Sequence, residues 1–427
     1  MRRGELLKRL KNGGLLNQLE PVYGMEANTA ADRLVELVRE YAEIFSAGED
    51  DDVWLFSTPG RTELGGNHTD HQGGRCLAGS VNLDTIACVV PNGSRRVRIQ
   101  SRHHRMAEIF LDDLAIHPEE TDSSAALVRG VAARMKQLGH APGGFDAYTT
   151  TRVLRGSGLS SSAAFEVLVC TIMDHLFCGG RFSPLQLAQV GQYAENVYYG
   201  KPCGLLDQLA CAWGGAITAD FRDLDCPIVR PVEVDLAREG FALAIVDAGA
   251  SHADLTEDYA AIPREMQLVA ACFGREILSQ VPYEQFFQQL PAVRTACGDR
   301  AALRALHFFQ EDRRVAGQCA ALERGDFAAF LHLVRQSGRS SFQYLQNVST
   351  GRDSRRQPLA LLLAAAEELL GNQGACRVHG GGFAGTIQAF VPLDRLEVFT
   401  AGMEAVAGQG ACHLLSIRRA GSVLLAS

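Results

Sequence analysis

Apolar residues recur along the chain in two rhythms, one typical of helices and one typical of strands. Positions 1–50 repeat apolar residues every three to four places, and 31–45 is the clearest amphipathic stretch. Strands are predicted at 53–56, 85–90, 97–100, 145–150, 241–246, 386–390 and 422–425. Helices are predicted at 125–138, 162–176 and 184–198, and over most of the chain from about 250 to 371. Because strands and helices mix without steady alternation, we expect an α+β fold and not a doubly wound parallel sheet.

The domain organisation follows from the length and from one break in the pattern. The chain has 427 residues, which exceeds one ordinary domain and suits two lobes of roughly 200 residues. An acidic, glycine-containing run at 48–52 separates the helical start from the first predicted strand. We therefore predict an N-terminal helical extension over 1–50, a first lobe over 51–235 and a second lobe over 236–427.

Composition and net charge limit the classes of partner that we expect for this protein. Hydrophobic residues make up 47% and charged residues 21%, as in ordinary globular proteins, and the net charge of −8 predicts neither a nucleic-acid nor an anionic-membrane partner. The longest apolar run, 359–366, is far shorter than the ~20 residues of a membrane helix. The 12 cysteines include no Cys-x-x-Cys pair, and the start of the chain has no apolar signal core. We expect a cytoplasmic protein with reduced thiols, and the oligomeric state stays open.

Lysine usage excludes one class of nucleotide-binding protein. The chain contains four lysines, and Lys201 alone follows a glycine. A P-loop requires Gly-Lys-Ser/Thr, whereas Lys201 is followed by Pro202. Walker-type ATPases are therefore excluded.

The first segment with candidate chemistry is the glycine-rich stretch 59–74, which we expect to form a turn region. It combines a guanidinium, carboxylates, an amide and imidazoles, the mixture of donors and acceptors that a polyhydroxylated substrate needs. An arginine fork also suits phosphate oxygens. A solvated polar turn is the alternative, and a zinc site is a weaker one because the two histidines have no third ligand at the usual spacing.

The second segment, 156–164, is rich in glycine and serine and leads directly into an apolar helix. Its glycines allow a concave nest of N–H donors, and the positive end of the helix dipole points to the same place. A flexible linker is the alternative, but linkers do not usually lie between a strand and a strong helix. The predicted phosphate-binding residues are Gly156, Ser157, Gly158, Leu159, Ser160, Ser161 and Ser162.

Two further segments are less specific. Asp207 lies between apolar residues, and such a carboxylate is either paired structurally or acts as a base. These two interpretations are equally supported by the residues alone. The glycine-rich stretch 379–385 is most simply a tight turn before a strand.

Together and in this order, the four segments resemble the GHMP family of small-molecule kinases, and within it the galactokinase branch. The resemblance runs from about residue 54 to the C-terminus, and includes a further block at 246–252 that continues to Tyr259. It implies a two-lobed fold with the active site between the lobes. It also implies an ATP- and Mg²⁺-dependent sugar-1-kinase, with galactose as the best single substrate.

The resemblance assigns a role to each matching residue. The 156–162 loop would surround the ATP phosphates, with Ser162 and Glu195 as Mg²⁺ ligands. Asp207 would accept or orient the proton of the anomeric hydroxyl, and Arg61 would stabilise charge on the transferring phosphoryl group. The residues expected at the sugar are Glu63, Asn67, His68, Asp70, Gly204 and Tyr259.

The chain also departs from the family pattern. Where galactokinases have Arg-x-Asn-x-Ile-Gly-Glu-His, this chain carries Glu63 at the asparagine position and Asn67 at the glutamate position. Because an amide donates as well as accepts and has no charge, the sugar's C5 or C6 substituent can differ from that of galactose. A uronic acid or N-acetylhexosamine kinase is the alternative, and a catalytically silent sugar sensor is a second. Arg155, beside the loop, either touches phosphate or faces solvent.

Overall fold

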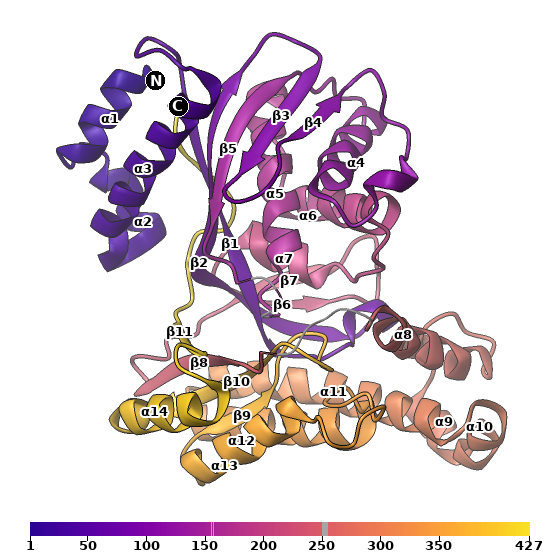
Figure 1. Cartoon of the computed structure of the whole chain (residues 1–427). Helices are drawn as coiled ribbons and strands as arrows, with labels where there is room; N and C mark the ends of the chain where they lie inside the picture. Colours follow the sequence, from indigo (N-terminus) through magenta and orange to yellow (C-terminus); the bar gives the residue numbers. More distant parts are fainter. Residues whose placement is uncertain (155, 157, 250–254) are drawn as a thin grey trace.

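A computed structural model describes residues 1–154, 156, 158–249 and 255–427 of the protein. The chain forms two lobes, each built on a sheet that carries helices (Figure 1). Helices and mostly antiparallel strands occur in both lobes, so the predicted α+β class is confirmed.

The larger sheet holds eight strands of the described chain, in the order β12-β1-β2-β5-β3-β4, with β6 on the far end of β2 and β7 beside β6. Only the pairing of β3 with β5 is parallel in this sheet. Its strands are β1 (Trp54–Gly65), β2 (Arg75–Pro91), β3 (Arg96–Ser101), β4 (Ala107–Phe110), β5 (Phe145–Thr151), β6 (Ala216–Asp220), β7 (Ile228–Val232) and β12 (Val423–Ala426).

Strand β1 differs from the prediction in its length. The residues up to Gly65, expected in a turn region, continue the strand and pair with β2, with Arg61 opposite Ser80 and Glu63 opposite Ala78. Nearly every residue of β1 is buried, because both of its faces are covered. A strand covered on both faces shows no polar–apolar alternation, and the apolar run at 53–56 therefore marks only its beginning.

Helices cover both faces of this sheet (Figure 1). One face carries α4 (Ser124–Gln137), α5 (Ser161–Met173), α6 (Pro184–Tyr193) and α7 (Leu206–Trp213), and π-helical turns η4 (Asp174–Cys178) and η5 (Ala194–Tyr199) extend α5 and α6. The other face carries the N-terminal helices α1 (Arg3–Lys11), α2 (Leu16–Tyr23) and α3 (Ala27–Phe45). Their apolar side chains, including Leu34 and Val38, pack in one cluster with Leu55 and Ile86 of the sheet.

A buried carboxylate also fastens the N-terminal helices to the sheet. Asp84 on β2 is fully buried and accepts hydrogen bonds from Tyr23 Oη (2.8 Å), Arg33 Nη2 (2.8 Å), Ser57 Oγ (2.6 Å) and Arg418 Nη1 (3.2 Å). Burial acts against ionisation, but the two guanidinium groups and the hydroxyls lower the pKa of Asp84 below its ordinary value. The extension is thus an integral layer of the first lobe.

Helix α5 is the most apolar helix of the first lobe. Among the described residues, Ser161–Cys178 alone has the length and mean hydropathy (1.3) of a membrane-crossing helix, and 67% of that stretch is buried inside the protein. Its residues Val167, Leu168 and Ile172 are fully buried in the main core. The helix therefore has the packing of a core helix.

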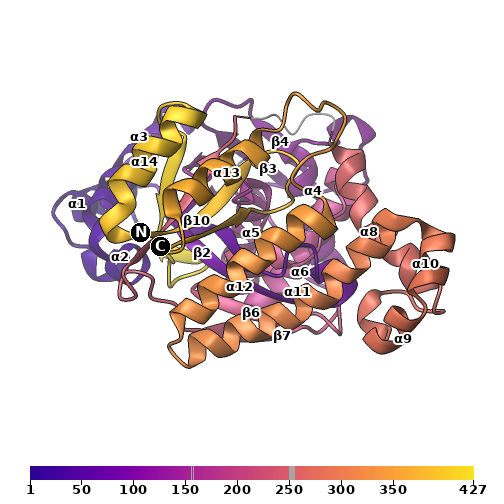
Figure 2. The same ribbon diagram turned by 90° about the horizontal axis from the view of Figure 1, so that it is seen from below.

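The second lobe is built on a four-stranded antiparallel sheet in the order β11-β8-β10-β9. Helices α12, α13 and α14 pack against this sheet, and α11 packs beside α12 (Figure 2). The strands are β8 (Phe241–Asp247), β9 (Ala375–Val378), β10 (Thr386–Pro392) and β11 (Cys412–Leu415). The helices are α8 (Thr256–Ala271), α9 (Tyr283–Gln288), α10 (Leu290–Cys297), α11 (Asp299–Glu323), α12 (Phe327–Ser340), α13 (Pro358–Leu370) and α14 (Leu396–Ala407). Shorter turns are η1 (Gly24–Glu26), η2 (Asp70–Gln72), η3 (Pro118–Glu120), η6 (Leu278–Gln280), η7 (Ser341–Leu345) and η8 (Leu393–Arg395).

The two lobes share one hydrophobic core. Phe56 and Leu77 of the first sheet belong to the same buried cluster as Ile245 of β8 and Phe330 of α12. The chain also returns to the first sheet at its end, where β12 pairs with β1. The C-terminal strand therefore belongs to the sheet of the first lobe, although it lies within 236–427.

Candidate active site

The glycine–serine loop connects β5 to the N-terminus of α5. Gly156 (φ +73°) and Gly158 (φ +71°) both have left-handed backbones, and a Cβ atom at Gly158 would come within 2.9 Å of His379 Nδ1. Glycine is therefore required at position 158 by conformation and by close packing. Arg155 and Ser157, both considered as phosphate contacts, lie outside the described residues, as does the 250–252 part of the family block.

A cavity of about 700 Å³ opens beside this loop, and Ser161 and Ser162 line it together with Phe165 of α5. Arginines also line it, from α3, the segment after β3 and the end of β5: Arg33, Arg102, Arg105 and Arg152. A volume of this size accommodates a nucleotide, and guanidinium groups suit its phosphates. The N-terminal helices thus contribute to the wall of the cavity next to the loop.

Arg61 and Asp207 form the ion pair at the centre of the site. The Arg61 Nε and Nη2 atoms lie 2.7 and 2.6 Å from Asp207 Oδ1, and Arg61 Nη1 donates to the carbonyl oxygen of Gly158. Burial opposes the charge on both groups, but each partner's opposite charge prevails, so the pKa of Arg61 is raised and that of Asp207 is lowered. Asp207 is therefore a carboxylate at neutral pH, held in the first turn of α7 with its side chain 32% exposed.

Two residues of the loop, Ser160 and Leu159, contact the Arg61–Asp207 pair and do not offer their side chains to a phosphate. Ser160, at φ +58°, donates its hydroxyl to Asp207 Oδ2, which orients the carboxylate. Leu159 is fully buried in the main core, and its carbonyl oxygen accepts the Arg61 N–H at 3.1 Å. The loop therefore positions the central ion pair as well as offering backbone donors.

A second polar cluster surrounds Glu195, which is 2% exposed in the π-helical turn η5. Its Oε1 accepts from Ser162 Oγ (2.9 Å) and from Lys201 Nζ (3.2 Å), and its Oε2 accepts from Gln208 Nε2 (2.8 Å). Gln208 Nε2 also donates to Oε1 of the fully buried Glu166 (2.7 Å). The structure thus brings together the two predicted Mg²⁺ ligands.

The chemistry of this cluster fits a magnesium ion. Glu166 Oε2 is buried and has no hydrogen-bond partner in the part of the chain that the structure describes, and burial together with the nearby Glu195 raises the pKa of Glu166 well above its ordinary value. The described residues contain no group of three or more His, Cys, Asp or Glu side chains arranged as a metal site. Mg²⁺ commonly takes one or two carboxylates and completes its shell with phosphate oxygens and water, so Glu195 and Ser162 would suffice as protein ligands for such an ion.

The predicted sugar residues His68, Asp70 and Gly204 adjoin this centre. Burial first, and the charge of Asp207 second, raise the pKa of Asp70 to about 6. A Cβ atom at Gly204 would clash with Asp70 Oδ2, so the segment preceding α7 approaches Asp70 as only glycine permits. These residues place a polar, partly buried surface beside the Asp207 carboxylate.

Tyr259 and His68 both meet the glycine turn between β9 and β10. His68 Nε2 lies 3.0 Å from the carbonyl oxygen of Gly381, and Tyr259 Oη donates to that of Gly382 at 2.8 Å. Burial lowers the pKa of His68 and raises the pKa of Tyr259 to about 12. The 379–385 segment, most simply a plain turn in the sequence, is thus the part of the second lobe that His68 of the 59–74 segment contacts.

The structure places Glu63 and Asn67 in the interior, away from Asp207 and hydrogen-bonded to each other. Asn67 Nδ2 lies 3.1 and 3.3 Å from the two Glu63 carboxylate oxygens, and it also donates to the Gly380 carbonyl oxygen (2.7 Å). Asn67 Oδ1 accepts from Asn347 Nδ2 at 2.8 Å, and Arg377 Nη2 donates to Glu63. Both residues are at most 5% exposed, and their polar side-chain atoms form hydrogen bonds within the protein.

Sequence reasoning missed several members of the site. His379 is buried, with Nε2 3.1 Å from Thr62 Oγ1, and Gln208 joins the two buried glutamates. His71 has both ring nitrogens buried without a hydrogen-bond partner among the described residues, and burial, with the neighbouring His68, lowers its pKa to about 3. Gln208 follows Asp207 directly, but nothing in the local pattern indicates that its amide bridges two carboxylates.

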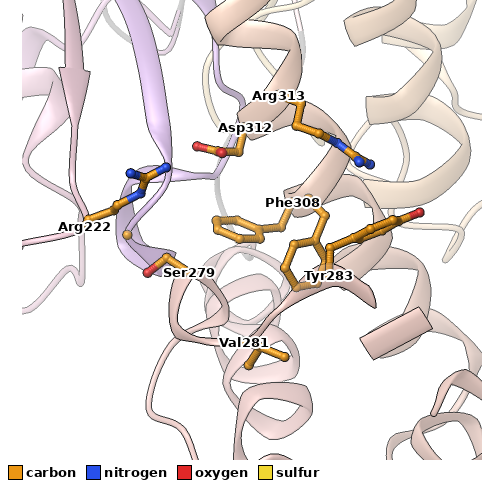
Figure 3. A pocket seen from close by; sticks show the side chains of 9 residues that line it. Arg222, Ser279, Val281, Tyr283, Phe308, Asp312 and Arg313 are labelled. Atoms are coloured by element: carbon orange, nitrogen blue, oxygen red, sulfur yellow. The ribbon is translucent and has the colours of Figure 1, made fainter. Parts of the chain in front are cut away.

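A second cavity, of about 170 Å³, lies away from these residues, between α9, α11 and the segment after β6 (Figure 3). Its rim carries charges that are already engaged: the Arg313 guanidinium lies 4.2 Å from the Tyr283 ring centroid, and Asp312 Oδ2 accepts from Arg75 Nη1 at 2.8 Å. None of the predicted site residues lines it.

Comparison with known proteins agrees with this arrangement. Residues 126–215 match the family described as GHMP kinases N terminal domain, and residues 39–91 match the galactokinase galactose-binding signature. The chain is 32% identical over 369 residues to a galactokinase of Streptomyces coelicolor, covering 85% of this chain and 90% of that protein. The chain belongs to the galactokinase family. Membership of this family supports an ATP-dependent sugar kinase.

Solved structures agree with the assignment to galactokinases. The crystal structure of Lactococcus lactis galactokinase complexed with galactose matches with a TM-score of 0.79 and 25% identity, covering 92% of this chain and 99% of that one. A crystal structure of mevalonate kinase matches with a TM-score of 0.61 at 12% identity, covering 86% of this chain and 99% of that one. The second likeness concerns the fold alone.

Proposed function

We propose that this galactokinase-family protein transfers the γ-phosphoryl group of ATP to the anomeric hydroxyl of galactose, giving galactose 1-phosphate. The observation that carries the proposal is the Arg61–Asp207 pair, which sits beside the glycine–serine loop with Asp207 partly exposed. A carboxylate and a guanidinium at the end of a phosphate-binding loop are the groups that phosphoryl transfer to a hydroxyl requires.

Asp207 and Arg61 would divide the chemistry of the transfer. The sugar's anomeric oxygen bonds to the γ-phosphorus as the bond from that phosphorus to the ADP oxygen breaks, and the hydroxyl proton passes to Asp207 and then to solvent. Asp207 has a lowered pKa, so it is ionised and ready to accept the proton's hydrogen bond. An anomeric hydroxyl is more acidic than an ordinary alcohol, which makes a carboxylate an adequate base. Arg61 would stabilise the charge that develops on the phosphoryl oxygens.

Ser162 and Glu195 would hold Mg²⁺, which neutralises charge on the β- and γ-phosphates when it is bound. Ser162 Oγ and Glu195 Oε1 already lie 2.9 Å apart, so both oxygens face one point at the start of α5. Gln208 fixes the orientation of the Glu195 carboxylate through its second oxygen. The α5 N-terminus would add its dipole to the attraction for the phosphates.

His68, Asp70, Gly204 and Tyr259 would bind the sugar. Asp70 offers a carboxyl with a pKa of about 6, and Gly204 leaves room beside it. Glu63 and Asn67 would act on the sugar indirectly, by holding the backbone on either side of His68 through the glycine turn. We place the protein in the cytoplasm, where ATP is available.

A coupled ADP-release assay over a panel of hexoses, uronic acids and N-acetylhexosamines tests the proposal. Galactose should give the highest kcat/KM, and Asp207→Asn should release no ADP above background with any sugar. Preference for a uronic acid or an acetylamino sugar would replace galactose as the substrate. ATP and galactose binding without ADP release would instead identify a sensor.

A further inference from the structure

Lys201 is a basic residue of the site to which neither the sequence nor the family assignment gives a role. It lies in the segment between η5 and α7, and its ammonium is 3.2 Å from Glu195 Oε1. Its side chain is 55% exposed, whereas that of its partner Glu195 is 2% exposed. The ammonium therefore reaches from the surface to a buried carboxylate of the proposed metal site.

The electric field of Lys201 extends across the site. The charge of Glu195 raises the pKa of Lys201 against the effect of burial, and Asp207 adds to the increase. In return, Lys201 contributes to lowering the pKa of Asp207 and opposes the increase in that of Tyr259. The ammonium thus contacts the proposed metal ligand Glu195 and acts electrostatically on Asp207 and Tyr259.

Glu195 does not depend on Lys201 for its hydrogen bonds. Ser162 and Gln208 satisfy one oxygen each, at 2.9 and 2.8 Å. Within the described part of the chain, the Lys201 ammonium donates a side-chain hydrogen bond to Glu195, and an ammonium has three donors. A long, half-exposed side chain with unused donors can change partners at little cost.

We propose that Lys201 binds the γ-phosphoryl group during transfer, and that it leaves Glu195 when Mg²⁺ takes that carboxylate. This inference rests on the proposed function. In the free protein the ammonium neutralises the carboxylate that later binds the metal. Once a divalent cation carries that charge, repulsion from the ion and attraction to the phosphate oxygens both draw Lys201 to the phosphoryl group.

The two cations of the site then have different duties. Arg61 is buried and fixed by Asp207 and Gly158, so it is preorganised on the side of the base. The Lys201 side chain is 55% exposed and lies on the side of the proposed metal ligand Glu195. Both stabilise the charge of the transferring group by hydrogen bonds, and neither forms a covalent bond to it.

The kinetic test compares Lys201→Met and Lys201→Arg with a matched control, Lys136→Met, whose lysine is exposed on α4. Lys201→Met should lower kcat about 100-fold, the effect of removing one preorganised donor to a developing anion. The KM for the sugar should stay within about twofold, and Lys201→Arg should recover part of the rate. The control should match the unaltered protein.

A binding test reads the same exchange without turnover. Lys201→Met should weaken the binding of ATP at saturating Mg²⁺ and without sugar, measured calorimetrically, by about tenfold, because a phosphate contact is lost. It should also tighten the binding of Mn²⁺ measured by electron paramagnetic resonance, because Glu195 no longer has a competing cation. Nucleotide affinity and kcat both within twofold of the unaltered protein would overturn the inference, and so would weaker Mn²⁺ binding.

The two tests separate this inference from the proposed function. If the unaltered protein phosphorylates no sugar, the proposed function fails, yet the ATP titration at saturating Mg²⁺ still reports whether Lys201 contacts phosphate. If the unaltered protein is active and Lys201→Met retains full kcat, the inference about Lys201 fails alone. Thermal unfolding midpoints of the three variants should agree within a few degrees, since both lysines are exposed.

Discussion

Compared with the family pattern, the carboxylate and the amide at positions 63 and 67 are interchanged, and the two side chains are in contact. Substitutions at these two positions should therefore affect the stability of the protein in a coupled way. Asn67→Glu restores the family's glutamate, but it places a second carboxylate against Glu63. The present Asn67 Nδ2 lies 3.1 and 3.3 Å from the Glu63 oxygens, and both residues are buried. At about 4 Å and an effective dielectric constant of about 20, the repulsion is about 4 kcal/mol.

The reverse single change is also costly, for a different reason. Glu63→Asn leaves the fully buried Arg377 without its carboxylate partner, and breaking a buried pair in this way costs about 3–5 kcal/mol. The double variant Glu63→Asn/Asn67→Glu keeps one carboxylate and one amide in the same volume. We therefore expect it to be at least about 3 kcal/mol more stable than the sum of the two single effects.

Urea denaturation of the full chain, followed by circular dichroism, measures the free energy of unfolding of the unaltered protein, the two single variants and the double variant. The two single variants should unfold at clearly lower urea concentration, and the double variant should return towards the unaltered protein. Additive effects, or an Asn67→Glu variant as stable as the unaltered protein, would refute the reasoning. The double variant is also the proper protein for testing sugar preference, because the single change confounds specificity with repulsion.

Three further predictions concern the site itself. Asp207→Asn should reduce kcat at least about 1,000-fold while calorimetry still detects ATP and galactose, and substantial activity would remove Asp207 as the base. Ser162→Ala should raise the Mg²⁺ concentration needed for half-maximal rate, whereas Ser161→Ala, the neighbouring control without the Glu195 contact, should not. Asp70→Asn should weaken galactose binding yet stabilise the free protein at pH 7 by up to about 3 kcal/mol. The pKa of Asp70 is about 6 in the folded protein, so the stability that its protonated carboxyl contributes is fully present below about pH 4 and is lost as the pH rises through 6. Asparagine has no such carboxyl and avoids this loss. Urea titrations of that variant at pH 4 and pH 7 should therefore show a gain at pH 7 only.

Much of the fold could be predicted because local patterns carry it. The periodicity of 31–45 matches α3 (Ala27–Phe45), and the apolar segment 241–246 lies within β8 (Phe241–Asp247). The short strands β4, β6, β7, β9 and β11 escaped prediction, since four or five residues, such as Ala375–Val378, offer too little pattern. The length of strand β1 was underestimated because the strand is buried on both faces and also contains polar residues of the 59–74 segment, so it shows no regular alternation.

The site could be predicted in part, because its main residues lie in short segments with a recognisable order. The contacts between segments could not. Glu63 meets Arg377 across 314 positions, and the pairing depends on how the two sheets are packed. The same holds for Ser160, whose left-handed backbone turns its hydroxyl to Asp207 and away from a simple phosphate contact. The local sequence indicates which residues are candidates, but it does not determine which distant residues they contact.

The most direct test of the central claim is to identify the product formed from galactose and ATP by phosphorus NMR. With Mg²⁺ present, the account predicts that the γ-phosphate signal is replaced by that of a phosphate coupled to the anomeric proton of galactose, with one ADP formed for each sugar. Phosphate on any other hydroxyl, or free inorganic phosphate without a sugar ester, would contradict the placement of Asp207 and Arg61 at the anomeric oxygen.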